Sequence, residues 1–180
     1  RLALVVMGYL CLNLLYSKVL KRIAFVDVLA IALGFVLRVV AGGLAAYAQV
    51  SGWLILCTLL LAMFLGFGKR RHELTALAGG PSTRAVLDSY PPALLDIALI
   101  LTASATIVAY TLYTQDPSVT ATFGTDRLWW TVPFIATGIA RFVWLVRRER
   151  PQSPTEQMLT DAPFLLNIAA WAALLGWLIS

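Results

Sequence analysis

The stretch VDVLAIALGFVLRVVAGGLAAYA, residues 26–48, decides the fold class of this chain. Its charged residues are Asp27 and Arg38, and nearly all the others are apolar or glycine. A helix needs about 20 mostly apolar residues to cross the hydrocarbon core of a bilayer. The stretch therefore predicts a membrane-spanning helix.

Similar apolar stretches occur on both sides of residues 26–48. The composition is 60% hydrophobic and 13% charged, whereas a soluble domain is about 45–50% apolar and about 25% charged. The further predicted spans run from Leu2 to Tyr16, Trp53 to Gly68, Pro92 to Tyr113, Leu128 to Val146 and Pro163 to Ile179. We expect an all-α membrane protein, a polytopic transmembrane helix bundle in which residues 1–180 form a single transmembrane domain.

Basic residues are distributed unequally between the loops. Alternate loops carry Lys18, Lys21 and Arg22, then Lys69, Arg70, Arg71 and Arg84, then Arg147, Arg148 and Arg150, whereas the intervening loops carry Arg127. Cytoplasmic loops of membrane proteins are enriched in Lys and Arg. This pattern predicts a multi-pass protein of the plasma (inner) membrane whose basic loops, and any site built on them, face the cytoplasm.

Asp27 and Arg38 are the charged residues of the second span. Eleven residues make about three turns, so the two side chains share a face but lie roughly 16 Å apart and do not pair directly. Arg38 near mid-span costs about 2.5–3.5 kcal/mol on insertion, so we expect it to face the bundle interior or a polar cavity. It is a candidate phosphate ligand, and the structural alternative is that it binds backbone carbonyls of a neighbouring helix.

The segments YSKVLKR (residues 16–22) and GFGKRRHEL (residues 66–74) concentrate cations at the ends of predicted spans. Cations beside a helix N-terminus make a phosphate site, although plain positive-inside anchoring explains the first segment equally well. The second segment has a similar alternative, a helix C-terminus neutralised by cations. His72 lies among three cations and is not favoured as a general base.

Two later segments allow structural interpretations. Arg84 and Asp88 at i, i+4 can form a salt-bridged helical turn, and Asp161 or Thr160 can cap the last span. The connection from Thr114 to Asp126 has the composition of a plain solvated loop.

The sequence lacks the Walker loop, HExxH, CxxC and GxSxG motifs. Their absence argues against NTPase, zinc hydrolase and serine hydrolase chemistry. A cation-rich surface over a helical bundle suits an anionic substrate whose apolar part lies in the bilayer, so the expected partners are a lipid and the membrane, with no nucleic acid.

Four segments resemble the decaprenyl-phosphate phosphoribosyltransferase branch of the UbiA prenyltransferase superfamily. They are YSKVLKRIAFVDVLAIALGFVLRVVAGG at 16–43, FLGFGKRRHEL at 64–74, RAVLDSY at 84–90 and SPTEQMLTDAPF at 153–164. The resemblance implies a nine-helix fold whose last six spans are present here. It also implies that the main Mg²⁺-binding aspartate motif precedes Arg1, so metal ligands within this chain are unknown and the chain alone is expected to be inactive.

The implied reaction moves a 5-phosphoribosyl group from phosphoribosyl pyrophosphate to a polyprenyl phosphate, giving a precursor of cell-envelope arabinan. Mg²⁺ and cations would stabilise the departing pyrophosphate. The resemblance implies catalytic roles for Asp27, Lys69, Arg70 and Glu73, and phosphate-binding roles for Tyr16, Lys18, Lys21, Arg22, Arg38, Arg71 and Arg84. We therefore expect the two ends, around Tyr16 to Asp27 and around Lys69 to Glu73, to line one cavity.

Two other functions stay open from the sequence. An aromatic or other polyprenyltransferase of the same superfamily would share the fold. A transporter or structural membrane subunit could use Asp27 and Arg38 in an ion path. The prenyl length and the oligomeric state are not predicted.

Overall fold

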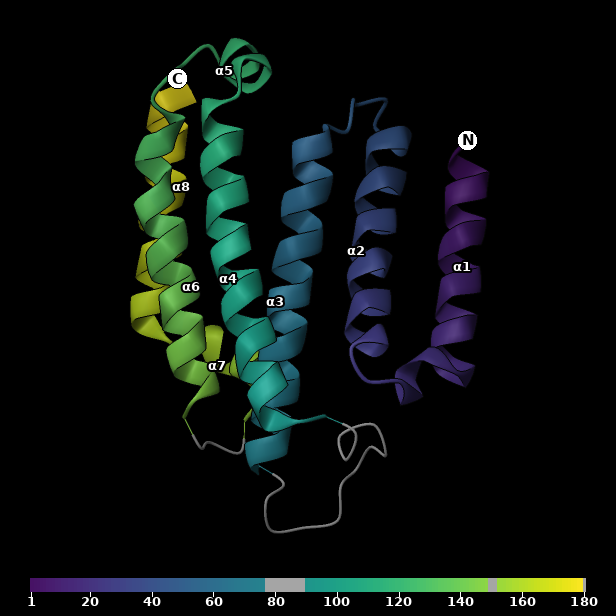
Figure 1. Cartoon of the computed structure of the whole chain (residues 1–180). Coiled ribbons are helices and arrows are strands. Elements are labelled where there is room, and N and C mark those ends of the chain that lie inside the picture. Colours follow the sequence, from purple (N-terminus) through teal and green to yellow (C-terminus); the bar gives the residue numbers. More distant parts are fainter. Residues whose placement is uncertain (77–89, 149–151, 180) are drawn as a thin grey trace.

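The computed structural model describes residues 1–76, 90–148 and 152–179. Long helices run alternately in opposite directions (Figure 1): α1 (Leu2–Lys18), α2 (Val26–Ala45), α3 (Gly52–Ala76), α4 (Pro92–Gln115), α6 (Val132–Val146) and α8 (Ala162–Ile179). Short helices lie between them: η1 (Leu20–Arg22), α5 (Pro117–Phe123), η3 (Leu128–Thr131) and α7 (Pro154–Met158). The described part contains no strand, so the predicted all-helical bundle is confirmed.

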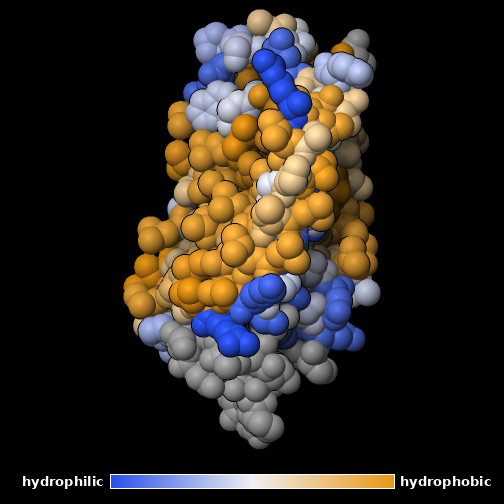
Figure 2. All heavy atoms as spheres, turned by 90° about the vertical axis from the view of Figure 1, so that its right-hand side faces the viewer, coloured by the Kyte–Doolittle hydropathy of each residue, from blue (hydrophilic) through white to orange (hydrophobic). Residues whose placement is uncertain are grey.

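Helix length and surface character agree with a membrane bundle. Helices α2, α3, α4 and α8, and η3 together with α6, are long and apolar enough to cross a membrane. Helix α1 is a shorter apolar helix of 17 residues. Figure 2 shows a broad belt of hydrophobic side chains between two hydrophilic ends. The 20 residues of α2 rise about 30 Å, which matches the thickness of the hydrocarbon core.

One end of the bundle gathers most of the basic residues. The last turn of α1, the whole of η1, the first turn of α2 and the last turns of α3 meet there, opposite the N- and C-termini (Figure 1). We call it the basic end. The alternation of basic loops predicts this grouping, and the cytoplasmic location of this end stays a prediction.

Two local features differ from the expectations, and a third is a short helix that was not predicted. Helix α3 continues beyond Gly68 to Ala76. The connection after α4 is not a plain loop, because Asp116 accepts a hydrogen bond from the Ser118 backbone N–H and caps α5. Before the last span, Ser153 forms a capping box that begins α7.

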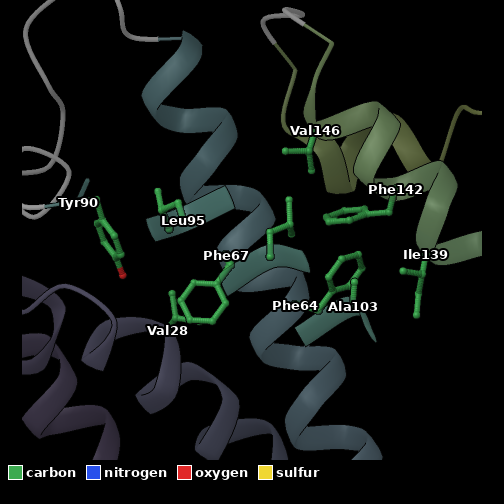
Figure 3. Packing of buried hydrophobic residues seen from close by; sticks show 10 residues of the cluster. Val28, Phe64, Phe67, Tyr90, Leu95, Ala103, Ile139, Phe142 and Val146 are labelled. Carbon is green, nitrogen blue, oxygen red and sulfur yellow. The ribbon is translucent and has the colours of Figure 1, made fainter. Parts of the chain in front are cut away.

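Helices α2, α3, α4 and α6 pack around a core that Figure 3 shows from close by. Glycines on α3 allow the close approach of its neighbours. A Cβ on Gly66 would lie 2.7 Å from Val28 Cγ1 of α2, and one on Gly68 would collide with the Phe142 ring of α6. Small residues of this kind let membrane helices approach closely, so α3 is fixed against α2 on one side and α6 on another.

The last span is tied to α6 by an ion pair. Arg141 donates from Nε and Nη2 to the two carboxylate oxygens of Asp161, at 2.9 and 2.8 Å. Asp161 also accepts from the Phe164 backbone N–H at 3.0 Å. The expectation that Asp161 caps the last helix is therefore confirmed.

Candidate functional site

The chain enters α2 at the basic end through a constrained turn. Phe25 has φ +65°, in the left-handed region that non-glycine residues rarely adopt. Its ring packs against Phe67 and Tyr90, with centroids 5.8 and 5.0 Å away. The turn places Asp27 in the first turn of α2, where the side chain is fully buried.

Asp27 binds three partners through its two carboxylate oxygens. Oδ2 accepts from Arg70 Nε of α3 at 2.8 Å. Oδ1 accepts from the Val28 backbone N–H at 2.8 Å and from the Tyr90 hydroxyl. The Tyr90 hydroxyl in turn accepts from the Phe25 backbone N–H at 2.7 Å. A buried carboxylate is stable only when paired and hydrogen-bonded, and these contacts meet that requirement.

Arg70 extends the cluster to Glu73. Its Nη1 donates to Glu73 Oε2 at 2.5 Å, one turn further along α3. The side chain of Arg70 is 3% exposed, whereas that of Glu73 is 21% exposed. We call Asp27, Arg70, Glu73 and Tyr90 the buried network. Glu73 is the charged member of the network that faces outward, and Arg70 links it to the fully buried Asp27.

The charges of the buried network do not balance. One guanidinium faces two carboxylates, which leaves a formal excess of one negative charge. Burial, followed by the hydrogen bond to Asp27, raises the pKa of Tyr90 well above its usual value. Tyr90 therefore keeps its proton at any working pH and acts as a donor to Asp27.

Three predicted phosphate ligands and Lys69, which was predicted to be catalytic, lie at the basic end outside this network. The side chains of Lys18, Lys21, Arg22 and Lys69 are exposed. Within the described part of the chain none of these four makes an ion pair. Exposed cations attract anions, which is the property that the predicted phosphate-binding role requires.

Of two other predicted phosphate-binding arginines, Arg71 forms an ion pair and Arg84 is not described. Arg71 Nε donates to Asp96 Oδ1 of α4 at 2.8 Å, in a pair that is partly open to solvent. It therefore points to a different side of α3 from Arg70. Arg84 lies outside the described residues, as does Asp88.

Arg38 is not brought to the buried network. Its side chain is exposed in this structure and lines a small cavity between α1 and α2 with Tyr9 and Asn13, so of the two predicted surroundings it has a cavity and not the bundle interior. Its Nη2 donates to the Tyr9 hydroxyl of α1 at 2.5 Å, and its guanidinium lies over the Tyr9 ring. The predicted backbone carbonyl partners are replaced by this phenol. Tyr16 lines the same small cavity, of about 90 Å³, between α1 and α2.

Sequence reasoning missed Asp96. It favoured a structural role for Tyr90 and did not favour His72 as a general base. His72 is buried, and neither ring nitrogen has a partner among the described residues. The burial of His72 was not predicted, because the sequence does not show which of the five consecutive polar residues from Lys69 to Glu73 points inward.

An apolar cavity of about 500 Å³ lies between α3, α4, α6 and α8. Phe64 and Phe142, which form part of the core, line it together with Tyr110 and Asn167, and its surface is almost entirely apolar. A cavity of this size and character is typical of a site for an apolar ligand.

The carboxylates of the basic end bear on the predicted Mg²⁺. Both oxygens of Asp27 accept bonds from protein donors, and one oxygen of Glu73 accepts from Arg70. Among the described residues no group of three or more His, Cys, Asp and Glu side chains could hold a metal ion. These residues do not fit a complete Mg²⁺ site, so Mg²⁺ stays a prediction from the resemblance.

Comparison with known proteins gives a consistent result. No family profile matches the chain. Decaprenyl-phosphate phosphoribosyltransferases of Mycolicibacterium smegmatis and Mycobacterium tuberculosis are each 30% identical to it over 97% of the chain. The enzyme of the same name from Corynebacterium glutamicum is 30% identical over 94% of the chain. The chain spans 52–57% of the length of these relatives. The predicted resemblance is therefore confirmed: over nearly its whole length this chain is similar to decaprenyl-phosphate phosphoribosyltransferases.

Proposed function

We propose that this chain belongs to a membrane transferase that moves a 5-phosphoribosyl group from phosphoribosyl pyrophosphate to a polyprenyl phosphate. The observation that carries the proposal is the buried network of Asp27, Arg70, Glu73 and Tyr90. The network lies at one end of an apolar helix bundle. The sequence of the chain is similar to that of decaprenyl-phosphate phosphoribosyltransferases. A reaction between a soluble anion and a lipid phosphate requires this combination of a charged end and an apolar body.

Both proposed substrates carry phosphates at the reacting end. The exposed cations of the basic end, including Lys21 and Lys69, would bind these phosphates by charge-assisted hydrogen bonds. An oxygen of the lipid phosphate forms a bond to C1 of the ribose while the bond from C1 to the pyrophosphate oxygen breaks. Negative charge accumulates on the leaving pyrophosphate, and fixed cations stabilise that charge.

Glu73 is the carboxylate of the network that is open to solvent and so is the member that a substrate can reach. The ribose becomes oxocarbenium-like as the pyrophosphate leaves, and a fixed carboxylate nearby stabilises such a cation. Arg70 and Asp27 hold Glu73 in place and are themselves shielded.

The apolar part of the lipid belongs in the bilayer or in the cavity between α3, α4, α6 and α8. The positive-inside distribution supports a site on the cytoplasmic face of the plasma membrane. The product would be a polyprenylphosphoryl phosphoribose, and its use in arabinan synthesis is part of the proposal.

The test uses membranes that contain the full-length protein, with phosphoribosyl pyrophosphate labelled in the ribose and decaprenyl phosphate as acceptor. We expect label to enter the organic phase only when both substrates are present. Membranes without the protein are the control. Absence of labelled lipid, with prenyl transfer from a prenyl diphosphate to an aromatic acceptor instead, would overturn the proposal in favour of an aromatic prenyltransferase.

A further inference from the structure

One hydroxyl joins the segment that enters α4 to the start of α2. Tyr90 Oη accepts from the Phe25 backbone N–H at 2.7 Å and donates to Asp27 Oδ1. Figure 3 shows Tyr90 beside α2, with its hydroxyl directed toward that helix. The residue is 3% exposed, so no solvent replaces these bonds.

We propose that Tyr90 is a positioning residue for the transfer reaction, which it controls through Asp27 and Arg70. The inference rests on the proposed function and adds a residue with no direct contact to substrate. Tyr90 holds one oxygen of Asp27, and the other oxygen holds Arg70. Arg70 in turn holds Glu73, the member of the buried network that reaches solvent.

The turn before α2 makes the hydroxyl necessary. Phe25 occupies a left-handed conformation that costs energy in a non-glycine residue. Such strain persists only when surrounding contacts over-determine it. The Tyr90 hydroxyl binds the Phe25 N–H directly, while the two rings pack 5.0 Å apart. Without the oxygen, this partly buried N–H loses its hydrogen-bond partner, and the strained turn loses its contact with Tyr90.

Loss of the Tyr90 hydroxyl should change kcat more than KM, because the exposed cations are not affected. The hydroxyl of Tyr90 bonds to neither Lys21 nor Lys69, and both lysines are exposed. They should therefore still bind phosphate when the Tyr90 hydroxyl is removed. A displaced Glu73, however, is wrongly placed for the charge that develops at the ribose. The loss should therefore fall on kcat, and KM should change little.

The experiment compares Tyr90→Phe with wild type in the full-length protein, using the labelled transfer assay. Phenylalanine keeps the ring and its packing and removes only the oxygen. We expect kcat to fall about 10- to 100-fold, the range in which small misplacements of reacting groups operate, with KM for phosphoribosyl pyrophosphate within about twofold. Tyr113→Phe, near the far end of the helix α4 that Tyr90 precedes, is the matched control and should leave both constants unchanged.

A double variant separates positioning from general destabilisation. If Tyr90 acts through Glu73, then adding Tyr90→Phe to Glu73→Gln should lower kcat by less than about twofold beyond the single Glu73→Gln variant. Independent structural damage would instead multiply the two losses. If too little folded Tyr90→Phe is recovered, Asp27→Asn tests the same link, because it weakens the hold on Arg70, and it should lower kcat without raising KM.

The two proposals fail in different ways. A wild-type protein without transfer activity would refute the proposed function. An active wild type with an unchanged kcat in Tyr90→Phe, a change confined to KM, multiplied losses in the double variant, or a normal kcat in Asp27→Asn would each overturn the positioning role of Tyr90.

Discussion

Replacement of Arg70 by methionine tests whether the buried network holds the basic end together. Methionine keeps much of the apolar stem but removes the guanidinium. Asp27, whose side chain is fully buried, then loses its cation, and Glu73 loses the same partner. Breaking a buried pair from one side costs about 3–5 kcal/mol, because the remaining charge is neither paired nor solvated.

The neighbouring ion pair provides a matched control. Each kcal/mol lowers Tm by about 2–4 °C for a chain of 150–250 residues, so Arg70→Met should lower Tm by about 6–20 °C. Arg71→Met breaks a pair whose side chains are 26% and 40% exposed. Exposed pairs contribute about 0–1 kcal/mol, so this second variant should lower Tm by at most about 4 °C.

Both variants can be measured in the same detergent, with Tm taken from the loss of the monodisperse size-exclusion peak after heating. The double variant Asp27→Asn/Arg70→Met should recover part of the loss, since it removes the orphaned charge. Equal Tm values for Arg70→Met and Arg71→Met would refute the reasoning. They would mean that Asp27 is not an uncompensated buried charge when Arg70 is absent.

Three further predictions follow from particular contacts. In the full-length protein Lys69→Ala should lower kcat by about 10²-fold and Arg147→Ala by less than about twofold, and equal small effects in the transfer assay would identify Lys69 as a membrane anchor. Gly68→Ala places a Cβ against the Phe142 ring and should cost about 1–3 kcal/mol, seen as a lower Tm, and an unchanged Tm would contradict the close packing of α3 and α6. Hydrogen bonds from Arg141 on α6 lower the pKa of Asp161. The stability that Asp161 contributes is therefore present above about pH 3.9, the pKa in the unfolded chain, and is lost as pH falls through the lower pKa of the folded state. The Tm difference between wild type and Asp161→Asn should stay constant from about pH 5 to 8 and close below about pH 4, and a difference that closed toward pH 8 would contradict this assignment.

The spans could be predicted because hydrophobic length alone determines them. The predicted starts at Val26 and Pro92 coincide with the observed helix starts. The end of α3 could not be found in this way. Its last two turns, from Lys69 to Ala76, are polar and are stabilised by partners on α2 and α4. An apolar run ends where the bilayer ends, whereas a helix ends where its backbone and side chains lose their partners.

Two short helices show a different limit. The residues that begin α7 carry a readable signal, because Ser153, Pro154 and Glu156 form the pattern of a capping box with proline at the first helical position. Similarly, Asp116 precedes Pro117 at the start of α5. Between Thr114 and Asp126 this signal was outweighed by the polar composition, which favours a loop, and for residues 153–158 no element was predicted. Local capping chemistry was therefore a better guide here than composition.

The pairing of Asp27 with Arg70 depends on the register between α2 and α3. The apolar pattern of either helix does not predict that register. Gly66 sets that register by allowing Val28 to approach α3 closely, and Arg70 lies one turn beyond Gly66 on the same face. A helix turns about 100° per residue, so Lys69, Arg70 and Arg71 point in three directions. Lys69 is exposed, Arg70 faces α2 and Arg71 faces α4. The positive-inside rule treats these three cations alike, because it counts charge and not direction. Their separate environments follow from the neighbours of α3. Arg70 is buried against α2, where it binds Asp27, whereas Lys69 is exposed and so is the cation that we propose to bind phosphate.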